Sequence, residues 1–496
     1  MKANPDTPTL PDDGAFTLST AFINGKWLSF DGHRHRPLID PDTEKTVGSI
    51  FCPRESVVDA AVQSAVRAQS DWAVSPIGDR LALLTRITEL VEKRSDQLAG
   101  IISAEIGAPI DFASAAQVQA AIQHLMATHE ALSDMTNETC TGGDPAHRVR
   151  YEAVGVAGLI TPWNWPLNQV VLKVGAALAA GCAMVLKPSE YATRSAMAFT
   201  EIVAEAGVPR GVFNLLIGDP ETGAQLVAHP GIDMVSFTGS TRGGQQVMQS
   251  ASARFARTAM ELGGKSPNLL FEDCDLETAV RQGLAHCFRN AGQSCNAASR
   301  MLVARPIYDD AVAFAADIAG KTQVGRPFDP GPHIGPLVNR AQFDRVRGFI
   351  EAGLGSGARL AAGGPDRPSH LHQGYYVRPT VFADVSPDNT LFQDEIFGPV
   401  LTMTAFEDED HAIQLANATR YGLAAYIQTA DPARADRVAS KLRAGMVQIN
   451  GTSRAQGAPF GGQKTSGHGR EGGLWGIRSF QEVKSISGLP ASPDQG

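Results

Sequence analysis

The sequence contains 496 residues, which is too long for one compact core and predicts about three domains. Hydrophobic residues make up 43% and charged residues 19% of the chain, with 50 Gly and 30 Pro, as in a globular protein with many tight turns. This composition excludes disordered, collagen-like and coiled-coil proteins. The 43 Lys and Arg against 52 Asp and Glu give a net charge of −9, and no basic run is present, which excludes a nucleic acid as partner.

The cysteines are too few and too widely spaced for a disulfide framework, and none forms a C-x-x-C pair, so we expect no metal site. Free thiols indicate a reducing compartment, and segment 1–14 lacks the apolar stretch of a signal peptide. We therefore expect a flexible lead-in and a cytoplasmic protein. The longest apolar stretch, 170–186, contains Lys173 and is interpreted as a buried helix running into a strand rather than a membrane span. The cysteines are Cys52, Cys140, Cys182, Cys274, Cys287 and Cys295.

The first half of the chain predicts helices, followed by strands that alternate with helices. From Ser56 to Leu98 apolar residues recur at helical spacing. After Val154 short apolar runs alternate with helical patterns, which predicts βαβ units and a doubly wound parallel sheet of the nucleotide-binding type. Strands are expected within 154–166, 183–190, 211–219 and 233–240, and helices over 168–180, from 194 and from 221.

A second alternating series follows Glu261 and predicts a second α/β domain. Two extended stretches, 149–153 and 480–487, fit neither sheet, and such segments often pair with another chain. Strands of the second series are expected within 266–272, 299–305, 374–385, 400–407, 424–430 and 445–450, with helices over 276–290 and 309–318.

The segment Arg289-Asn-Ala-Gly-Gln-Ser-Cys295-Asn places a cysteine after a glycine-containing turn. Such a turn can leave the thiol exposed, as a nucleophile requires. The alternative is that Cys295, like most free cysteines, is a small buried hydrophobic residue. This segment alone leaves both interpretations open, whereas Cys182, Cys274 and Cys287 are assigned to the core.

Two polar residues stand at positions suited to catalysis. Glu261 ends an apolar stretch beside two glycines, where a carboxylate is either a solvent-facing residue or a base held over a reacting centre. Asn164 lies in the rigid loop Thr161-Pro-Trp-Asn-Trp-Pro166 after a predicted strand, at the edge where open α/β sheets bind ligands. Its amide is either part of a turn or a donor to an oxyanion.

The standard dinucleotide fingerprint G-x-G-x-x-G does not follow any predicted strand. Instead, the turn Phe237-Thr-Gly-Ser-Thr-Arg-Gly-Gly244 lies between a strand and a helix, where backbone N–H groups suit a pyrophosphate. Lys187 and Glu190 leave another strand, where they are suited to bonding ribose hydroxyls. Each stretch taken alone is more often an ordinary turn.

Taken together, these segments resemble the aldehyde dehydrogenase superfamily, in its hydrolytic NAD(P)-dependent branch. The resemblance runs from about Phe22 to about Val483, nearly the whole chain. Its specific motifs are AFINGKWL, LITPWNWP, LKPSE, FTGST, MELGGKSP, FRNAGQSC, QDEIFGPVL and PFGGQKTSGHGREGG.

The resemblance implies an α/β fold with a Rossmann-type cofactor-binding domain at 15–133 and 154–263. It further implies an α/β catalytic domain at 264–463 and a β oligomerisation arm at 134–153 and 478–490. Family members dimerise through this arm, often on to tetramers, so we expect a homodimer or homotetramer without membrane contact.

The resemblance also implies the mechanism. Cys295 would attack the aldehyde carbonyl, and the amide of Asn164 and the backbone N–H of Cys295 would hold the oxyanion. After hydride transfer to the nicotinamide, water activated by Glu261 would hydrolyse the thioester. Lys173 and Glu471 match positions of a proton relay, although either is also suited to a structural ion pair.

The cofactor implied is NAD, with NADP as a weaker alternative, because the Glu190 carboxylate would accept bonds from ribose hydroxyls and repel a 2′-phosphate. The family often has Lys where this chain has Arg345. The implied cofactor contacts are Thr161, Pro162, Trp163, Lys187, Glu190, Gly218, Gly223, Phe237, Ser240, Leu262, Gln342, Arg345, Glu395 and Phe397.

For the substrate, Arg289 matches an arginine with which semialdehyde dehydrogenases grip a distal carboxylate, and Arg454 matches another tunnel-wall position. Trp165 and Phe460 would line the apolar part of the tunnel. Leu172 stands where succinic-semialdehyde enzymes often have a further arginine, so the anion would differ in length or shape. We therefore expect an anionic semialdehyde, against the alternative of a neutral aliphatic or aromatic aldehyde.

Two further alternatives are weaker. A dehydrogenase that transfers the acyl group to coenzyme A generally lacks the base that Glu261 supplies. A non-catalytic structural protein on the same fold, as in some lens proteins, would not need Cys295, Glu261 and Asn164 together.

Overall fold

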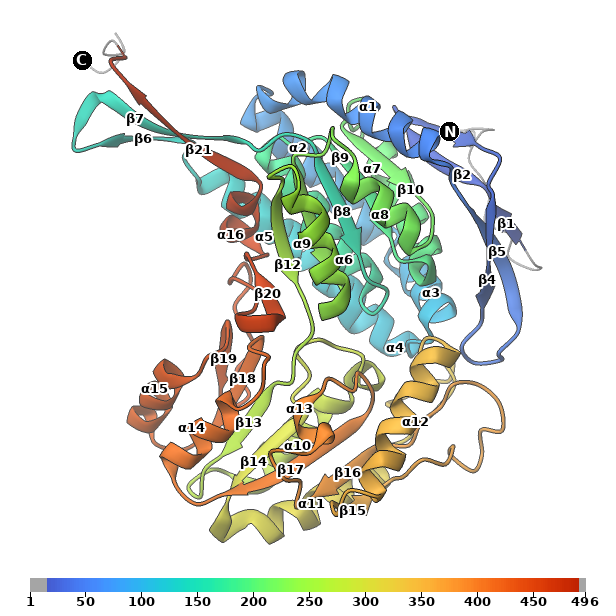
Figure 1. Ribbon diagram of the computed structural model, residues 1–496, viewed down its shortest axis with the longest axis vertical. Coiled ribbons are helices and arrows are strands. Elements are labelled where there is room, and N and C mark those ends of the chain that lie inside the picture. The colour runs from blue at the N-terminus through green and yellow to red at the C-terminus, as the bar shows by residue number, and fades with distance from the viewer. Residues whose placement is uncertain (1–15, 490–496) are drawn as a thin grey trace.

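The structure is a computed structural model that describes residues 16–489. Within these residues it contains two large sheets and two small ones, with helices packed around the large sheets (Figure 1). The expected flexible lead-in, residue 15 of the first expected domain and residue 490 of the expected arm lie outside the described residues.

An eight-stranded sheet forms the centre of the first α/β unit, in the order β20-β12-β11-β8-β9-β10-β2-β3. The run from β12 to β10 is parallel and largely buried, as expected for strands covered on both faces, which confirms the predicted strands. The sequence did not predict the antiparallel edges. The strands are β2 (Thr20–Ile23), β3 (Lys26–Ser29), β8 (Ala157–Thr161), β9 (Met184–Pro188), β10 (Phe213–Leu216), β11 (Met234–Thr238), β12 (Arg257–Glu261) and β20 (Gly467–His468).

Helices pack around this sheet, and α6 is buried along all of its 15 residues, including the polar Asn168, Gln169 and Lys173. It leads into β9, which confirms the interpretation of 170–186 as a buried helix followed by a strand. No described helix is long and apolar enough to cross a membrane. The helices are α1 (Glu55–Ala73), α2 (Ile77–Lys93), α3 (Ser95–Ile106), α4 (Ile110–Phe112), a π-helical segment (Ala113–Val118), α5 (Gln119–Asp134), α6 (Pro166–Ala180), α7 (Thr193–Glu205), α8 (Pro220–Ala228), α9 (Thr241–Ser252) and α16 (Gly473–Ser479).

A seven-stranded sheet forms the second unit, in the order β15-β16-β17-β14-β13-β18-β19, and only its edge strand β15 is antiparallel to its neighbour. The expected second α/β series is confirmed. The strands are β13 (Pro267–Leu270), β14 (Arg300–Ala304), β15 (Arg359–Ala362), β16 (Thr380–Ala383), β17 (Val400–Phe406), β18 (Ala424–Gln428) and β19 (Met446–Ile449). The helices are α10 (Leu276–Phe288), α11 (Tyr308–Lys321), α12 (Arg340–Leu354), α13 (Thr390–Gln393), α14 (Glu409–Asn417) and α15 (Pro432–Lys441).

Helix α10 ends earlier than the sequence predicted. The pattern placed its end at Asn290 and put Arg289 on its last turn, but the helix ends at Phe288. Asn290 and Ala291 have φ values of 55° and 53°, which a right-handed helix does not allow. Arg289 is therefore the capping residue, and the chain turns sharply toward Cys295.

Two small sheets complete the fold, in the orders β1-β5-β4 and β21-β7-β6. In the second, the extended stretches 149–153 and 480–487, which fitted neither expected α/β series, pair with each other in antiparallel register. The small sheets contain β1 (Phe16–Leu18), β4 (Arg34–Ile39), β5 (Thr46–Cys52), β6 (Glu138–Thr141), β7 (Asp144–Ala153) and β21 (Gln481–Ser487).

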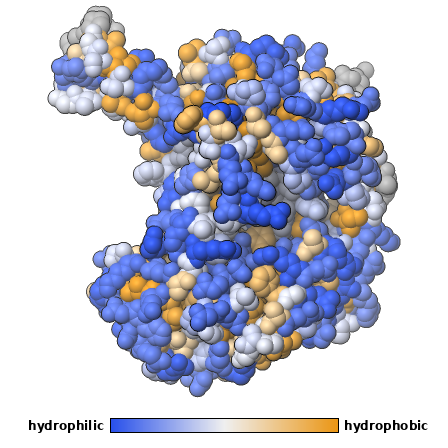
Figure 2. All heavy atoms as spheres, viewed as in Figure 1, coloured by the Kyte–Doolittle hydropathy of each residue, from blue (hydrophilic) through white to orange (hydrophobic). Residues whose placement is uncertain are grey.

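Strands β6, β7 and β21 form an arm that projects from the body of the molecule at the upper left of Figure 1. Apolar residues are visible along this arm in Figure 2, and Val483 on β21 is 64% exposed. Trp475 on the neighbouring α16 is 54% exposed. Large apolar side chains exposed on one projecting element are typical of an interface.

The path of the chain brings its last part to the first sheet. After β12 the chain crosses to the second unit at β13, and it returns at β20, where Gly467 pairs with Glu261. The end of β12 is therefore in contact with a segment about 200 residues later in the sequence.

Candidate active site

A cleft of about 420 Å³ lies where the two α/β units meet. It is lined from the first unit by the loop after β8, the start of α9 and the end of β12, and from the second unit by segments near residues 295, 342–345, 395–397 and 420. Clefts between units at the carboxyl ends of parallel strands are the usual ligand sites of α/β proteins.

Cys295 lines this cleft and is only partly buried, whereas Cys182 and Cys287 are buried. Cys274, which was assigned to the core, is also only partly buried and packs against the core of the second unit. The turn before it depends on Gly292, where a Cβ would lie 2.0 Å from the carbonyl oxygen of Gly398. Burial raises the pKa of the Cys295 thiol, and the carboxylates of Glu395 and Glu261 raise it further. The thiol therefore carries its proton at neutral pH and needs a base in order to act as a nucleophile.

Asn164 is held against the loop that carries Cys295. Its side chain is 4% exposed, and its Nδ2 donates to the carbonyl oxygen of Gln293 at 3.0 Å. Asn290 in turn donates from Nδ2 to the carbonyl oxygen of Asn164 at 2.8 Å. Asn164 and Cys295 both line the cleft, so the amide and the thiol have fixed positions in one site.

Glu261 ends β12 and is 3% exposed. Neither of its carboxylate oxygens has a hydrogen-bond partner within residues 16–489. Gly461 lies against it, and a Cβ there would lie 2.7 Å from Oε1 of Glu261. Burial raises the pKa of Glu261 well above its usual value, and the nearby Glu471 raises it further. A buried, unpaired carboxylate in the same cleft as a thiol has the properties of a general base.

Lys173 and Glu471 form a buried ion pair, with Nζ and Oε1 2.6 Å apart. Lys173 also donates to Oγ of Ser236 at 2.8 Å. Neither member of the ion pair lines the cleft, but the charge of Lys173 lowers the pKa of Glu261 and that of Glu471 raises it. The pair is therefore electrically coupled to Glu261 from behind the cleft.

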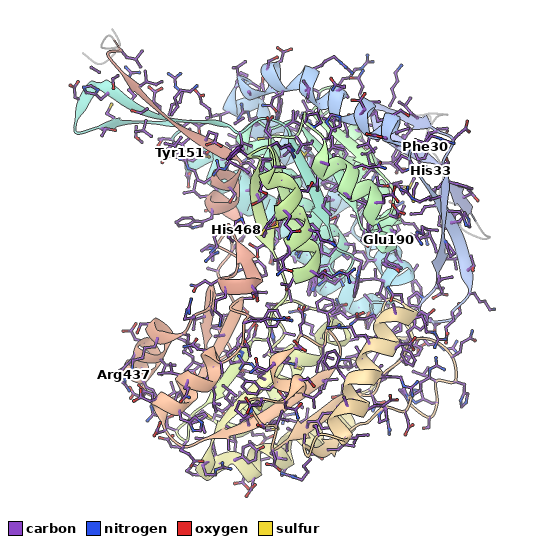
Figure 3. All side chains as sticks on the ribbon, viewed as in Figure 1. Phe30, His33, Tyr151, Glu190, Arg437 and His468 are labelled. Carbon is purple, nitrogen blue, oxygen red and sulfur yellow. The ribbon has the colours of Figure 1, made fainter. Side chains whose placement is uncertain are left out.

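Lys187 and Glu190 lie beyond the cleft, at the ends of β9 and the following turn, with Nζ and Oε2 3.9 Å apart. Glu190 and the arm residue Tyr151 are labelled on opposite sides of the first unit in Figure 3. Gly223 stands beside Lys187, since a Cβ there would lie 3.7 Å from Cδ of that lysine. The backbone carbonyl of Thr161 accepts from the N–H of Ser189 at 2.9 Å.

Gly218 is closely packed, because a Cβ there would lie 2.3 Å from Oγ1 of Thr222. The next residue, Asp219, caps α8 and accepts from Arg34 on β4 at 3.0 Å. No motif in the sequence indicated that Arg34 contacts the residue next to Gly218. Six expected cofactor contacts do not line the cleft: Thr161, Lys187, Glu190, Gly218, Gly223 and Phe237.

The glycine-rich turn after β11 leads into α9. Ser240 is the N-cap of α9, and its Oγ accepts from the N–H of Gly243 at 3.1 Å. The ring of Phe237 packs under the turn, where a Cβ on Gly239 would lie 2.7 Å from it. Backbone N–H groups at the start of this 12-residue helix are thus presented at the cleft, where they suit a phosphate.

Segment 394–398 between α13 and β17 forms the opposite wall. Glu395 accepts from the N–H of Gly264 at 3.1 Å, and burial raises its pKa to about 7. Phe397 packs edge-on against Trp163 with ring centroids 5.6 Å apart. Gln342 and Arg345 line the same wall. The expected cofactor contacts in the cleft are Pro162, Trp163, Ser240, Leu262, Gln342, Arg345, Glu395 and Phe397.

The expected substrate residues form a separate group, outside the cleft. The Arg289 guanidinium lies over the rings of Trp165 and Phe112, 5.2 and 5.1 Å from their centroids. Arg454 lies over Phe460 at 4.8 Å. Burial lowers the pKa of both arginines, while the charges of Glu471 and Glu261 raise that of Arg454. Neither arginine forms an ion pair with a carboxylate in the described part of the chain.

Sequence reasoning missed several residues that line the cleft. Gly239 to Arg242 lie within the turn that it did quote, so a closer analysis of that motif would have included them. Arg420 and Tyr421 lie in the loop between α14 and β18, where no pattern distinguishes them from surface residues. The missed lining residues are Gln169, Thr238, Gly239, Thr241, Arg242, Gly263, Arg420 and Tyr421.

Comparisons with known proteins identify the family and the fold. A model of the aldehyde dehydrogenase family matches residues 27–486. A 3-succinoylsemialdehyde-pyridine dehydrogenase of a Pseudomonas species is 44% identical over 473 residues, covering 95% of this chain and 98% of the relative. The solved structure of an aldehyde dehydrogenase from Bartonella henselae has a TM-score of 0.94 at 46% identity, covering 96% of this chain and all 100% of the other. A cysteine-to-alanine variant of an aldehyde dehydrogenase from Pseudomonas syringae, solved with NAD+ and octanal, has a TM-score of 0.93 at 42% identity, covering 96% and 97%.

Proposed function

Because the chain belongs to the aldehyde dehydrogenase family, we propose that it oxidises an aldehyde to the free carboxylic acid with NAD, through a covalent bond to Cys295. It is an oxidoreductase that acts on aldehydes. The observation that carries the proposal is the presence of Cys295, Asn164 and Glu261 in one cleft. Acyl transfer to coenzyme A and a non-catalytic role are disfavoured by the same three residues.

The residues of the cleft fit NAD. Its volume of about 420 Å³ is that of a ligand site, and the N-terminus of α9 suits the pyrophosphate. Lys187 and Glu190 would hold the adenosine ribose, and Glu395 and Phe397 the nicotinamide end. When bound, NAD supplies the acceptor for the hydride.

The residues of the chain itself provide the other steps. The Cys295 thiol loses its proton to a base and its sulfur bonds to the carbonyl carbon, which places negative charge on the carbonyl oxygen. Nδ2 of Asn164 and the backbone N–H of Cys295 donate to that oxygen. When the C–H bond breaks and the hydride leaves, the carbonyl re-forms as a thioester on Cys295.

Glu261 acts in the second half of the reaction. Its unpaired carboxylate accepts a proton from water, the hydroxide attacks the thioester carbon, and the C–S bond breaks to release the acid. A raised pKa suits this role, since a base whose pKa lies nearer neutrality accepts the proton more strongly. The Lys173 and Glu471 pair behind it would carry the proton away.

For the substrate, we propose an anionic semialdehyde gripped by Arg289, because this arginine has no carboxylate partner in the described residues and its planar fork suits a carboxylate. Arg454 would contribute a second positive charge. A neutral aldehyde is the second candidate, and it is favoured by the octanal bound to the Pseudomonas syringae relative.

We further propose that the arm joins subunits into a dimer or tetramer, supported by its exposed Val483. None of the six cysteines is in a disulfide, which supports a reducing compartment such as the cytoplasm.

The test is the formation of reduced cofactor with a panel of aldehydes, with and without coenzyme A. We expect oxidation without coenzyme A, preferring a semialdehyde to an uncharged aldehyde of equal length. Cys295→Ala should bind NADH normally and oxidise nothing. Oxidation at the wild-type rate by this variant would refute the mechanism, and strict dependence on coenzyme A would refute hydrolysis.

A further inference from the structure

Segment 394–398, which forms one wall of the cleft, has a strained backbone that depends on contacts with other segments. Phe397 has φ = +61°, in the left-handed region that residues other than glycine rarely occupy. Glu395 and Phe397 nevertheless line the cleft from this segment. A strained segment keeps one conformation only when the surrounding contacts determine it.

Three of those contacts come from two residues of α12. Nε2 of Gln342 donates to the carbonyl oxygen of Phe397 at 2.7 Å and to that of Ile396 at 3.2 Å. Arg345 donates from Nη2 to the carbonyl oxygen of Glu395 at 2.5 Å. Helix α12 thus holds the middle of the segment.

Arg420 holds the start of the segment, from the loop between α14 and β18. Its Nη2 lies 3.2 Å from Oδ1 of Asp394. The same guanidinium donates to the hydroxyl of Tyr421 at 3.1 Å and itself lines the cleft. The segment is therefore gripped between α12 and Arg420.

The backbone of Arg420 is fixed to the floor of the cleft. Its carbonyl oxygen accepts from the N–H and the hydroxyl of Thr465, at 3.1 and 2.8 Å. The buried Ser466 accepts from the N–H of Gly422 at 3.0 Å and donates to the carbonyl oxygen of Gly263 at 2.6 Å. Because the backbone of Arg420 is fixed by these bonds, its guanidinium meets Asp394 from a defined position.

Because this ion pair is exposed, a role in positioning the segment can be distinguished from a role in the stability of the fold. The side chains of Arg420 and Asp394 are 57% and 40% exposed, and ion pairs at such exposed positions contribute little to stability. We propose that Arg420 is a positioning residue, which acts through Asp394 to hold Glu395 and Phe397 in the conformation that binds the nicotinamide riboside half of NAD. This inference rests on the proposed function and adds to it a residue that does not touch the reacting atoms.

The test compares Arg420→Ala, Asp394→Asn and the double variant. NADH affinity, from fluorescence titration, should fall about fivefold in each single variant and no further in the double variant. AMP affinity, from competition, should stay at the wild-type value, because AMP lacks the nicotinamide half. Arg420→Lys should recover part of the loss, since an ammonium can still pair with Asp394.

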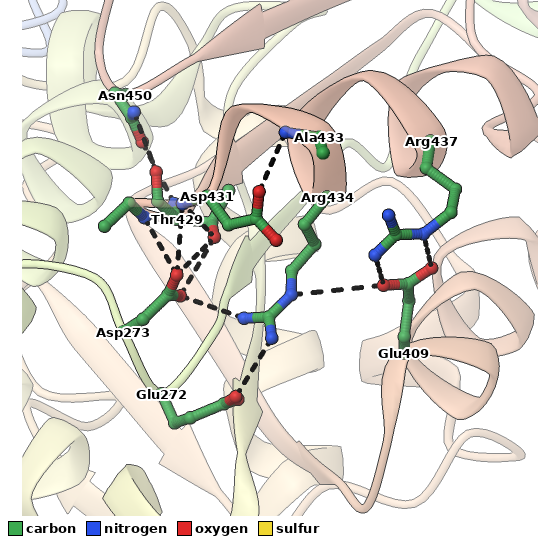
Figure 4. A network of polar contacts seen from close by, with 10 residues as sticks. Glu272, Asp273, Glu409, Thr429, Asp431, Ala433, Arg434, Arg437 and Asn450 are labelled. Carbon is green, nitrogen blue, oxygen red and sulfur yellow. Dashed lines mark hydrogen bonds and ion pairs between the residues drawn. The ribbon is translucent and has the colours of Figure 1, made fainter.

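Arg437→Ala is the matched control. Arg437 is 48% exposed and pairs with Glu409 at 2.7 Å in the same α/β unit, within the network of Figure 4. It should leave both affinities unchanged. The proposal is overturned if AMP affinity falls as much as NADH affinity, if the two single losses add, or if Asp394→Asn strengthens NADH binding, which would mean a direct contact between Arg420 and the cofactor. These are binding measurements, so a wild-type protein that binds NADH but oxidises no aldehyde would refute the proposed function alone.

Discussion

Two groups of charged residues near the catalytic residues differ in whether their charges are neutralised by the protein. Lys173 and Glu471 are buried, neutralise each other at 2.6 Å, and are bonded further to Ser236. Arg289 and Arg454 instead lie over aromatic rings and have no carboxylate partner among residues 16–489.

The difference indicates which charges are neutralised within the protein and which are available to pair with a ligand. Removing one partner of a buried ion pair leaves an uncompensated charge and costs about 3–5 kcal/mol. Removing an arginine that has no partner in the protein exposes no such charge. The first group should therefore govern stability and proton transfer, and Arg289 should govern the choice of substrate. Arg454 also lowers the pKa of Glu261, so it is coupled to the base as well.

The largest expected effect is that of Glu261→Gln, since Glu261 is the base to which the buried pair is coupled. Its loss should slow steady turnover by about 10²- to 10⁴-fold, the usual contribution of a general base. A rapid burst of reduced cofactor should remain if the thioester forms before hydrolysis. Stopped-flow absorbance measures both phases, and a burst slowed as much as the steady rate would mean that Glu261 also activates Cys295.

The pH profile sharpens this prediction. Burial raises the pKa of Glu261, and only its ionised form can accept a proton. The wild-type hydrolysis rate should therefore rise with pH through that raised pKa and level off above it. Glu261→Gln should lose this rising limb, while a retained limb would assign it to another group.

Lys173→Met tests the balanced group directly. We expect it to lower the free energy of unfolding by about 3–5 kcal/mol, because Glu471 is left as a buried unpaired charge. The rising limb of the pH profile should move to higher pH, since Lys173 lowers the pKa of Glu261. Thermal unfolding and the pH profile measure the two effects.

A double variant supplies the control for Lys173. Lys173→Met combined with Glu471→Leu removes both charges and should recover most of the lost stability. If the double variant is less stable than Lys173→Met, the ion pair is not the source of the loss.

Arg289→Ala tests the unbalanced group. It should lower kcat/KM for a semialdehyde about tenfold, the worth of one hydrogen-bonded charge, and leave an uncharged aldehyde of equal length unaffected. Its unfolding temperature should match that of the wild type. Arg281→Ala, at an exposed arginine of α10 that pairs with Glu277, is the control, because Arg289 caps the same helix. Equal losses for both substrates would favour the neutral aldehyde.

The smallest expected effect lies at the cofactor end. Lys187 and Glu190 are 3.9 Å apart, a looser pair than Lys173 and Glu471, and Glu190 is 20% exposed. Glu190→Gln should raise the ratio of NADP to NAD efficiency about fivefold, because it removes like-charge repulsion of about 1 kcal/mol from a 2′-phosphate. An unchanged ratio of kcat/KM values would show that Glu190 does not set the preference.

Much of the fold could be predicted from local pattern alone. The apolar runs of β8, β9, β10 and β11 are short and continuous, as expected of strands buried on both faces. The sequence missed the sheet β1-β5-β4 and the antiparallel strands at the edges of the large sheets. Strands β3 and β4 are mostly exposed and carry no apolar run, although their partners lie close by in the sequence. Strand β20 has only two residues, and its partner β12 lies about 200 residues earlier. The predicted end of α10 was wrong because the hydrophobic pattern does not reveal the left-handed conformation of Asn290 and Ala291.

The site residues likewise fall into those that could be identified from a local motif and those that could not. Cys295 and Glu261 stand in short distinctive segments that also lie beside the cleft, so the sequence was informative about them. Ser236, Phe112 and Arg420 carry no such signal, since each matters through a residue that is distant in the sequence. Lys173 bonds to Ser236 across 63 positions and to Glu471 across 298.

Because Glu471 lies so late in the sequence, it also affects when the site can form during synthesis on the ribosome. At about 5–20 residues per second, Glu471 is made roughly 10 to 35 seconds after Cys295. Until then helix α6 carries a lysine without its counter-charge, and strand β12 lacks its outer neighbour β20. A nascent chain can therefore expose the reactive thiol but not complete the site around Glu261. Enzyme activity should appear in one step near the end of translation, when the last strands reach the first sheet.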